Sequence, residues 1–338
     1  MQLVLPGETA TPGKTANPNG VTGTATAATV GSNYIVTVNA VDYDWNINTL
    51  ADDTVRVRSV SDDNDSDPNP LALINGTQTY TINLRTALPL TLTATDEAPG
   101  VFGSLAAAER TNVVNSEATV KLQLVLPGET ATPGKTANPN GVTGTATAAT
   151  VGSNYIVTVN ATDLFWNVNT TADHQVHVAT SDANDTEPNT QPLINGVRSF
   201  TIGFKTASPT TITATDETGG PTFTLFAHSA ITVNPATATN LILFVPSETA
   251  APGTTTGVTG SVTNAVAGAS YVVTVNAVDP NWNTNTSNTN TVTLTTTDSN
   301  AVIVPTAVTL SAGTATTTIT FKTASQTGWV ITVIAGEV

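Results

Sequence analysis

Acidic and amide side chains stand at alternate positions of one turn, with a spacing that calcium-binding loops use. The oxygen-bearing side chains of this turn are Asp42, Asp44, Asn46 and Asn48. Calcium prefers six to eight oxygen ligands, and positions 1, 3, 5 and 7 of a loop supply them in known sites. The glycine expected at position six is replaced by Ile47. The turn therefore predicts either a calcium site or a tight turn that Asp and Asn cap through their own backbone.

The same turn occurs twice more along the chain. Its oxygen-bearing residues are Asp163, Asn167 and Asn169 in the second case and Asp279, Asn281, Asn283 and Asn285 in the third. Each turn also carries a tryptophan, at Trp45, Trp166 and Trp282. Tryptophan rings stacked on their own domain or on a domain junction would indicate a structural role. A row of rings facing solvent would indicate a binding surface.

A second group of acidic residues lies after each turn. Its members are Asp62, Asp63 and Asp65 in the first case, Asp182, Asp185 and Glu187 in the second, and only Asp298 with Asn300 in the third. Carboxylates this close repel one another unless a cation or screening salt intervenes. The cluster predicts a calcium site, completed by the first turn or by a neighbouring domain, or else a solvated acidic loop.

These recurrences belong to a tandem repeat. Residues 2–40 reappear letter for letter at 123–161, and a looser copy follows in which Pro246 stands for Pro6 and Pro127. The 338 residues therefore divide into three modules, predicted at 1–117, 118–236 and 237–338, the last lacking its final strand. Stacked copies of one module usually build length or valency rather than a single active site.

Each module is predicted to be built from short β-strands. Residues 34–41 alternate apolar and polar side chains at a period of two, and the pattern returns at 155–161 and 271–277. About seven such strands per module, separated by Pro- and Gly-containing turns, indicate an all-β chain of tandem immunoglobulin-like β-sandwich domains.

The turn sequence also carries a family resemblance. The segment Val41-Asp42-Tyr43-Asp44-Trp45-Asn46 resembles the VxDxxGN turn of bacterial Ig-like (Big) repeats, and the segments LVLPGETATPG, FTIGFKTAS and TITATDE resemble arrays of such repeats in giant bacterial surface proteins. The resemblance implies a bacterial protein that is extracellular or on the cell surface. Tryptophan replaces the turn glycine, so invasin-like binding is not implied.

Composition argues against several other functions. The net charge of −15 disfavours nucleic acid and anionic membrane surfaces as partners, and no apolar run is long enough to span a membrane. The absence of cysteine excludes disulfides and thiol chemistry. The histidines, His174, His177 and His228, form no metalloprotease or other catalytic motif. We therefore expect a protein that is not an enzyme.

The leading functional hypothesis is an extracellular rod or filament of Ig-like domains, stiffened by calcium. Its partner would be a further copy of itself, joined head to tail when the QLVLP strand at residues 2–6 completes the end domain of the next protomer. The simpler alternative is an excerpt of a longer repeat chain whose next residues supply that strand covalently. From sequence it is open whether QLVLP closes the domain before it or begins the domain after it. The alternative is an adhesin or carbohydrate-binding array that contacts a surface glycan or a cell-envelope partner.

Overall fold

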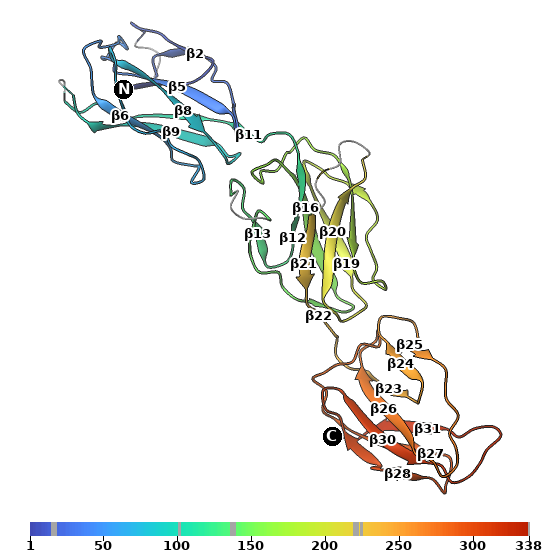
Figure 1. Ribbon diagram of the computed structural model, residues 1–338. Helices are drawn as coiled ribbons and strands as arrows, with labels where there is room; N and C mark the ends of the chain where they lie inside the picture. The colour runs from blue at the N-terminus through green and yellow to red at the C-terminus, as the bar shows by residue number, and fades with distance from the viewer. Residues whose placement is uncertain (15–18, 101–102, 136–139, 219–222, 224–225, 337–338) are drawn as a thin grey trace.

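The computed structural model describes residues 1–14, 19–100, 103–135, 140–218, 223 and 226–336. No helix occurs among these residues, and every strand pairs within one of three successive segments, 1–115, 121–234 and 240–335. Figure 1 shows the three β-sandwich domains following one another end to end. The expected all-β fold with Ig-like sandwiches is confirmed. Parts of the two TPGKTANPNG loops, residues 15–18 and 136–139, lie outside the described residues.

Domain 1 pairs a three-stranded sheet, in the order β1-β5-β8, with a four-stranded sheet, in the order β10-β9-β6-β7. Smaller pairings join β2 to β3 and, in parallel, β4 to β11. The strands are β1 (Gln2–Val4), β2 (Glu8–Ala10), β3 (Val21–Gly23), β4 (Ala28–Thr29), β5 (Asn33–Asn39), β6 (Thr54–Ser59), β7 (Leu71–Ala72), β8 (Thr77–Asn83), β9 (Leu90–Ala98), β10 (Ala108–Asn112) and β11 (Val114–Asn115).

Domain 2 repeats this topology, with sheets β12-β16-β19 and β18-β17-β20-β21 and the same two small pairings, β13-β14 and β15-β22. Its strands are β12 (Lys121–Val125), β13 (Glu129–Ala131), β14 (Val142–Gly144), β15 (Ala149–Thr150), β16 (Asn154–Thr162), β17 (Gln175–Thr180), β18 (Gln191–Pro192), β19 (Val197–Gly203), β20 (Thr210–Asp216), β21 (Phe226–Ile231) and β22 (Val233–Asn234).

Domain 3 has the sheets β23-β26-β30-β28 and β29-β27-β31, with β24 paired to β25. Its strands are β23 (Asn240–Phe244), β24 (Glu248–Ala251), β25 (Gly257–Gly260), β26 (Tyr271–Val278), β27 (Thr291–Thr296), β28 (Val302–Val304), β29 (Ala307–Thr309), β30 (Thr314–Thr320) and β31 (Ile331–Ala335). Here β31 takes the place of β9 and β20. No described strand pairs with its other edge, which β10 and β21 occupy in the first two domains.

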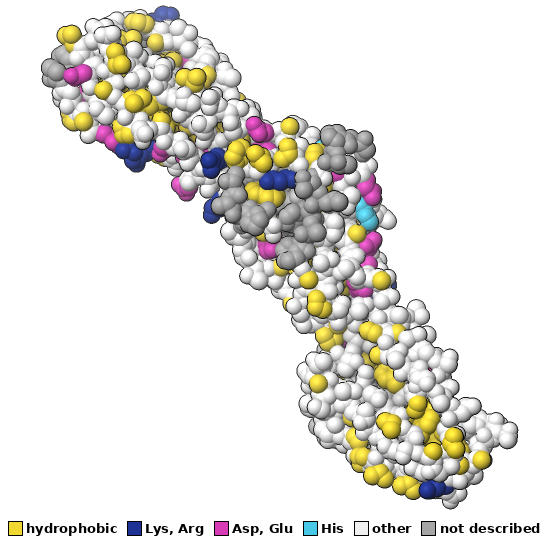
Figure 2. Space-filling view, in the orientation of Figure 1, with side chains coloured by type: hydrophobic (Ala, Val, Ile, Leu, Met, Phe, Trp, Pro, Cys, Tyr) yellow, Lys and Arg dark blue, Asp and Glu magenta, His cyan; other side chains and the backbone are white. Residues whose placement is uncertain are grey.

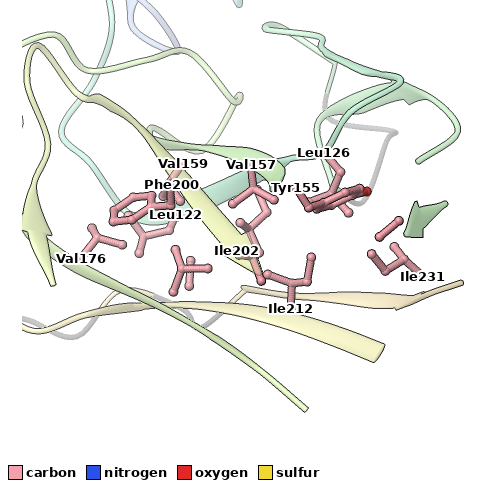
Figure 3. Close-up of a cluster of buried hydrophobic side chains, with 14 of the residues drawn as sticks. Leu122, Leu126, Tyr155, Val157, Val159, Val176, Phe200, Ile202, Ile212 and Ile231 are labelled. Carbon is pink, nitrogen blue, oxygen red and sulfur yellow. The ribbon is translucent and has the colours of Figure 1, made fainter. Parts of the chain in front are cut away.

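The core of each domain comes from the alternating strands. In domain 2, Val157, Val159 and Ile202 are fully buried between the two sheets, as Figure 3 shows. Their neighbours along β16 point outward, and Ile156 is 54% exposed. The period-two pattern seen in the sequence therefore separates core from surface.

The open edge of domain 3 leaves apolar surface that the other domains bury. In domain 1 the last strands cover Ala28 and Val30, which are 1% and 0% exposed. Their counterparts in domain 3, Ala265 and Ala267, are exposed, and Val262 nearby is 60% exposed. The first strand of domain 3, β23, is also less buried than β12, because no described strand of domain 3 takes the place of β21.

The structure also settles which domain holds the QLVLP strand. Gln2 to Val4 pair antiparallel with Asn39 to Thr37 in β5, and Leu3 and Leu5 are each only 2% exposed. The second copy, in β12, pairs with β16 of domain 2 in the same way. This strand therefore begins the domain that follows it. In domain 1 it is already part of a sheet, so it is not available to complete another domain.

Candidate functional site at the domain junctions

The repeated turn is organised by its first aspartate in all three domains. In domain 1, Asp42 Oδ1 accepts hydrogen bonds from the backbone N–H of Asp44 at 2.9 Å and of Asn46 at 2.8 Å. Asp163 and Asp279 accept the equivalent bonds in domains 2 and 3 at 2.8 to 3.0 Å. The hydrogen bonds from Asn46 lower the pKa of Asp42. The turn is thus held by the side-chain caps expected for Asx turns.

The tryptophan of each turn takes a backbone conformation that usually favours glycine. Trp45, Trp166 and Trp282 have φ values of 65°, 67° and 66°. Each indole lies on a glycine of its own domain, and a Cβ atom added to Gly20, Gly141 or Gly257 would lie 2.3–2.4 Å from the ring. Trp166 is 6% exposed, and the Lys121 ammonium lies 3.3 Å from the centroid of its ring. The rings therefore stack on their own domains, as the structural interpretation requires, instead of forming a row in solvent.

The asparagine at the fifth position crosses to the preceding domain. Asn167 accepts a hydrogen bond from the N–H of Ala87 at 2.8 Å and donates one to the carbonyl of Arg85, also at 2.8 Å. Asn283 makes the same pair of bonds to Ala207 and Lys205, at 2.7 and 2.9 Å. In the turns of domains 2 and 3, one asparagine side chain therefore joins two domains through both of its polar atoms.

The first aspartate also binds the linker that enters its domain. Asp163 Oδ2 accepts from the N–H of Glu117 at 3.2 Å, and Asp279 Oδ2 accepts from the N–H of Ala236 at 3.0 Å. Both carboxylates are completely buried, with 0% exposure. The same turn thus fixes both the linker and the face of the preceding domain.

On the other side of each junction, an aspartate of the acidic cluster shapes the loop that receives the asparagine. Asp62 Oδ2 accepts from the N–H groups of Arg85 and Thr86, at 2.7 and 2.8 Å. Asp182 and Asp298 make the same bonds in domains 2 and 3 at 2.8–3.1 Å. Although burial opposes the shift, these hydrogen bonds lower the pKa values of Asp182 and Asp298.

Close backbone approach completes the junction. A Cβ atom on Gly134 would lie 2.2 Å from Thr86 Oγ1, and one on Gly253 would lie 2.3 Å from Thr206 Oγ1. Asn64 and Asn184 donate to the carbonyls of Pro133 and Pro252, each at 3.4 Å. Phe165, at the third position of its turn, packs against the core of domain 1. A glycine is required at each contact because no side chain fits there.

The remaining acidic residues lie around these contacts rather than in a shared cage. Among the described residues, no group of three or more His, Cys, Asp or Glu side chains is arranged to hold a metal ion. Asp44 and Asp63 are exposed, and Glu187 accepts from the N–H of Thr180 at 3.1 Å. Asn281 is partly buried and donates its backbone N–H to Asp279.

Asp65 has the most perturbed carboxyl group of this set. Burial, together with the nearby charges of Asp67, Asp62 and Asp63, raises its pKa to about 7, and its Oδ2 atom is buried without a hydrogen-bond donor. In domain 2 the equivalent Asp185 accepts a hydrogen bond from the Thr180 hydroxyl at 2.5 Å. Burial, the largest cause, raises its pKa too, and Glu187 and Asp182 add to the shift.

It was not predicted from the sequence that the turn of one domain and the acidic cluster of the preceding domain face each other across a junction. From sequence, a calcium site in the acidic cluster could be completed by the first turn or by a neighbouring domain. No role was predicted for Gly134, Gly253 or the backbone of residues 85–87 and 205–207. The available signal was the repetition of Pro-Gly at 133–134 and 252–253 together with an invariant turn Asn within this chain.

The sequence matches no protein-family model and no curated protein. Solved structures that match this chain include invasin, a bacterial integrin-binding protein, at 14% identity and a TM-score of 0.33. That match covers 91% of this chain and 54% of the invasin chain, so the chain spans about half the length of invasin. A glycosyl hydrolase family 2 member from Bacteroides cellulosilyticus is 12% identical over 68% of this chain and 28% of its own, with a TM-score of 0.27.

Fibronectin(III)-like modules of CbhA from Clostridium thermocellum are 10% identical, with a TM-score of 0.21. The match covers 69% of this chain and 95% of that chain. In the part of the chain that the structure describes, no helix is both long and apolar enough to cross a bilayer.

Proposed function

We propose that the protein is a rigid rod of Ig-like domains that acts as a spacer on a bacterial cell surface. The observation that carries this proposal is the repetition of one set of polar contacts at both junctions. Both junctions use the same Asn bonds, the same Asp–linker bond and the same Gly–Thr contact. A flexible tether needs no such set of contacts, because mobile domains are connected by polar linkers that few contacts cross.

The burial of polar groups supports rigidity. Asn167 and Asn283 are 1% and 2% exposed, so their side-chain amides are shielded from water at the junctions. Separating the domains about these residues would break their interdomain hydrogen bonds, and only rehydration would offset the loss. The surface drawn in Figure 2 consists mainly of uncharged polar side chains and backbone, which suits a solvated rod.

Small-angle scattering and negative-stain electron microscopy test this proposal. The native chain should give one narrow distribution of interdomain angles at both junctions. The Asn167→Ala/Asn283→Ala double variant should broaden that distribution while each domain stays folded by circular dichroism. A native chain that already samples a wide range of angles would overturn the proposal.

Calcium stiffening is a separate proposal, directed at the acidic loops. It is supported by the unpaired Asp65 oxygen and by the burial and neighbouring carboxylates that raise the pKa of this group to about 7. A cation bound only by the folded state would stabilise it by mass action. The melting temperature should fall on chelation and recover with calcium. An unchanged melt in chelator would leave turn capping as the role of these carboxylates.

Strand complementation is proposed only at the open edge of β31. It is supported by the exposure of Ala265 and Ala267 and by the unpaired backbone of that edge within the described chain. A synthetic peptide of residues 108–115 should raise the melting temperature of domain 3. A scrambled peptide is the control, and equal effects of the two would contradict the proposal.

A further inference from the structure

The two outer faces of the molecule repeat the two halves of its internal junctions. We define the N-terminal face as Pro12, Gly13, Asp42, Asp44 and Asn46 of domain 1, and the C-terminal face as Asp298, Asn300, Lys322, Thr323 and Ala324 of domain 3. The first set corresponds by position to Pro133, Gly134, Asp163, Phe165 and Asn167. The second corresponds to Asp62, Asn64, Arg85, Thr86 and Ala87.

The N-terminal face already has the conformation that docks elsewhere. Asp42 caps its turn with the same hydrogen bonds as Asp163, and the Gly13 N–H donates to the Asp44 carbonyl as the Gly134 N–H does to Phe165. Gly13 keeps the left-handed φ of 76°, yet nothing lies within 4 Å of a Cβ atom placed on it. Gly13 and the exposed Asn46 thus belong to a turn with the conformation seen at the internal junctions, but no described domain is docked on it.

The C-terminal face is equally complete. Asp298 accepts from the N–H groups of Lys322 and Thr323, and Asn300 Nδ2 donates to Thr323 Oγ1 at 3.2 Å. The same Asn–Thr bond is 3.3 Å at Asn64 in the first junction and 3.2 Å at Asn184 in the second. Lys322, Thr323 and Ala324 are exposed. Lys322 and Ala324 correspond to Arg85 and Ala87, whose backbone groups form hydrogen bonds with Asn167 at the first junction.

We propose that the C-terminal face of one copy of this chain binds the N-terminal face of a second copy through the contacts of the internal junctions. This step rests on the proposed rod and extends it to a head-to-tail assembly. Asn46 would accept from the Ala324 N–H and donate to the Lys322 carbonyl, and Asn300 would reach the Pro12 carbonyl. The exposed Asp44 and Lys322 add opposite charges to the two faces.

Association is expected to be weak in dilute solution. The covalent linker supplies a high effective concentration at the internal junctions and one further hydrogen bond to the turn aspartate, and separate copies have neither. The experiment therefore traps the contact. A Cβ atom on Gly134 would lie 3.1 Å from the Cβ of Asn64, and one on Gly253 would lie 3.1 Å from that of Asn184, close to the separation that a disulfide spans.

The test uses the full chain, which contains no native cysteine. Mild oxidation of the Gly13→Cys/Asn300→Cys variant should produce a ladder of disulfide-linked oligomers on a non-reducing gel. Either single variant can give dimers at most. In the Tyr43→Cys/Asn300→Cys control the first cysteine lies at a turn position whose counterparts, Leu164 and Pro280, stay exposed at the junctions. This control should be trapped at least ten times more slowly.

Asn46→Ala placed in the trapping variant should slow ladder formation about ten-fold, and Tyr43→Ser should leave it unchanged. A ladder with these dependences supports the proposal. Absence of species beyond dimers, or equal trapping in the Tyr43→Cys control, would overturn it. Either negative result leaves the rod proposal standing, because microscopy of the single chain tests that separately.

Discussion

The turns at Asp42 and Asp163 differ in surroundings but not in conformation. Asp42 and Asn46 are exposed, whereas Asp163 and Asn167 are 0% and 1% exposed. Even so, both aspartates cap the same two backbone N–H groups, and both tryptophans hold nearly the same φ. The comparison teaches that local sequence forms the turn. The junction then uses the polar groups that the turn leaves available, so its asparagine needs no rearrangement to bind.

Substituting the turn tryptophans should give the largest difference in stability between the turn of domain 1 and the turn of domain 2. Trp166→Ala removes a nearly buried indole that packs on Gly141 and Lys121, and should cost domain 2 about 3–5 kcal/mol. Trp45→Ala, in a turn that no other described domain covers, should cost domain 1 less. Calorimetry of the full chain, with separate transitions assigned to the domains, measures both. Equal losses would show that the junction adds nothing to the packing of Trp166.

Substituting the turn asparagines tests the junction more directly. Asn167→Ala leaves the partly buried backbone groups of Arg85 and Ala87 without their partner, and should cost about 2–3 kcal/mol. The matched variant Asn46→Ala loses only bonds within an exposed turn and should cost under about 1 kcal/mol. Hydrogen exchange at the Ala87 amide provides a local readout. It should accelerate in Asn167→Ala and stay unchanged in Asn46→Ala.

The junction glycines give a smaller contrast. Alanine at a left-handed position costs about 1 kcal/mol, and Gly13→Ala and Gly134→Ala share this cost. Only Gly134→Ala also places a methyl group against Thr86, so we expect about 1–2 kcal/mol of additional destabilisation there. Denaturant midpoints of the two variants check the difference. A Gly13→Ala variant as unstable as Gly134→Ala would mean that backbone strain alone explains both.

Substitutions in the acidic loops should change the stability least, and the change should depend on pH. The pKa of Asp65 is raised to about 7 in the folded protein, above its unfolded value of about 3.9. The folded state therefore holds the extra proton between these values, and stability falls as pH rises from about 4 to about 7. Because this carboxyl is partly exposed, solvent screening limits the loss to the order of 1 kcal/mol.

Asp65→Asn should remove this loss, so the variant should melt higher than the native chain at pH 8 and nearly equally at pH 4. Asp185→Asn is the matched variant in domain 2. The Thr180 hydroxyl already donates to Asp185, so we expect a smaller gain at pH 8. A larger gain from Asp185→Asn would contradict the difference drawn between the two loops.

Much of the fold was predictable because it depends on local periodicity. Alternation in residues 34–41 placed Val36 and Val38 in the core, and the structure buries both completely. The domain to which the QLVLP strand belongs was not predictable, since an apolar strand at a domain boundary can pair with either neighbouring domain. The pairing of Leu3 with Val38 shows that it belongs to the domain that follows it.

The candidate site was predictable in its residues but not in its arrangement. Asp42, Asp163 and Asp279 were singled out by spacing, and calcium binding and turn capping shared the same pattern of oxygens. Sequence spacing records how side chains follow one another along the chain. It does not record which backbone N–H groups lie close enough to donate to those side chains. In the folded protein, such N–H groups donate hydrogen bonds to the turn aspartates.

The sequence by itself determined the repeat, the sandwich class and the conformation of each turn, because these can be read from identical segments and from side-chain patterns a few residues long. Only the tertiary structure decided that Asn167 meets Arg85 and Ala87, residues about eighty positions away. Such a meeting depends on how one folded domain is seated on the next. That orientation results from burial and hydrogen bonding summed over the whole junction, which no single stretch of sequence contains.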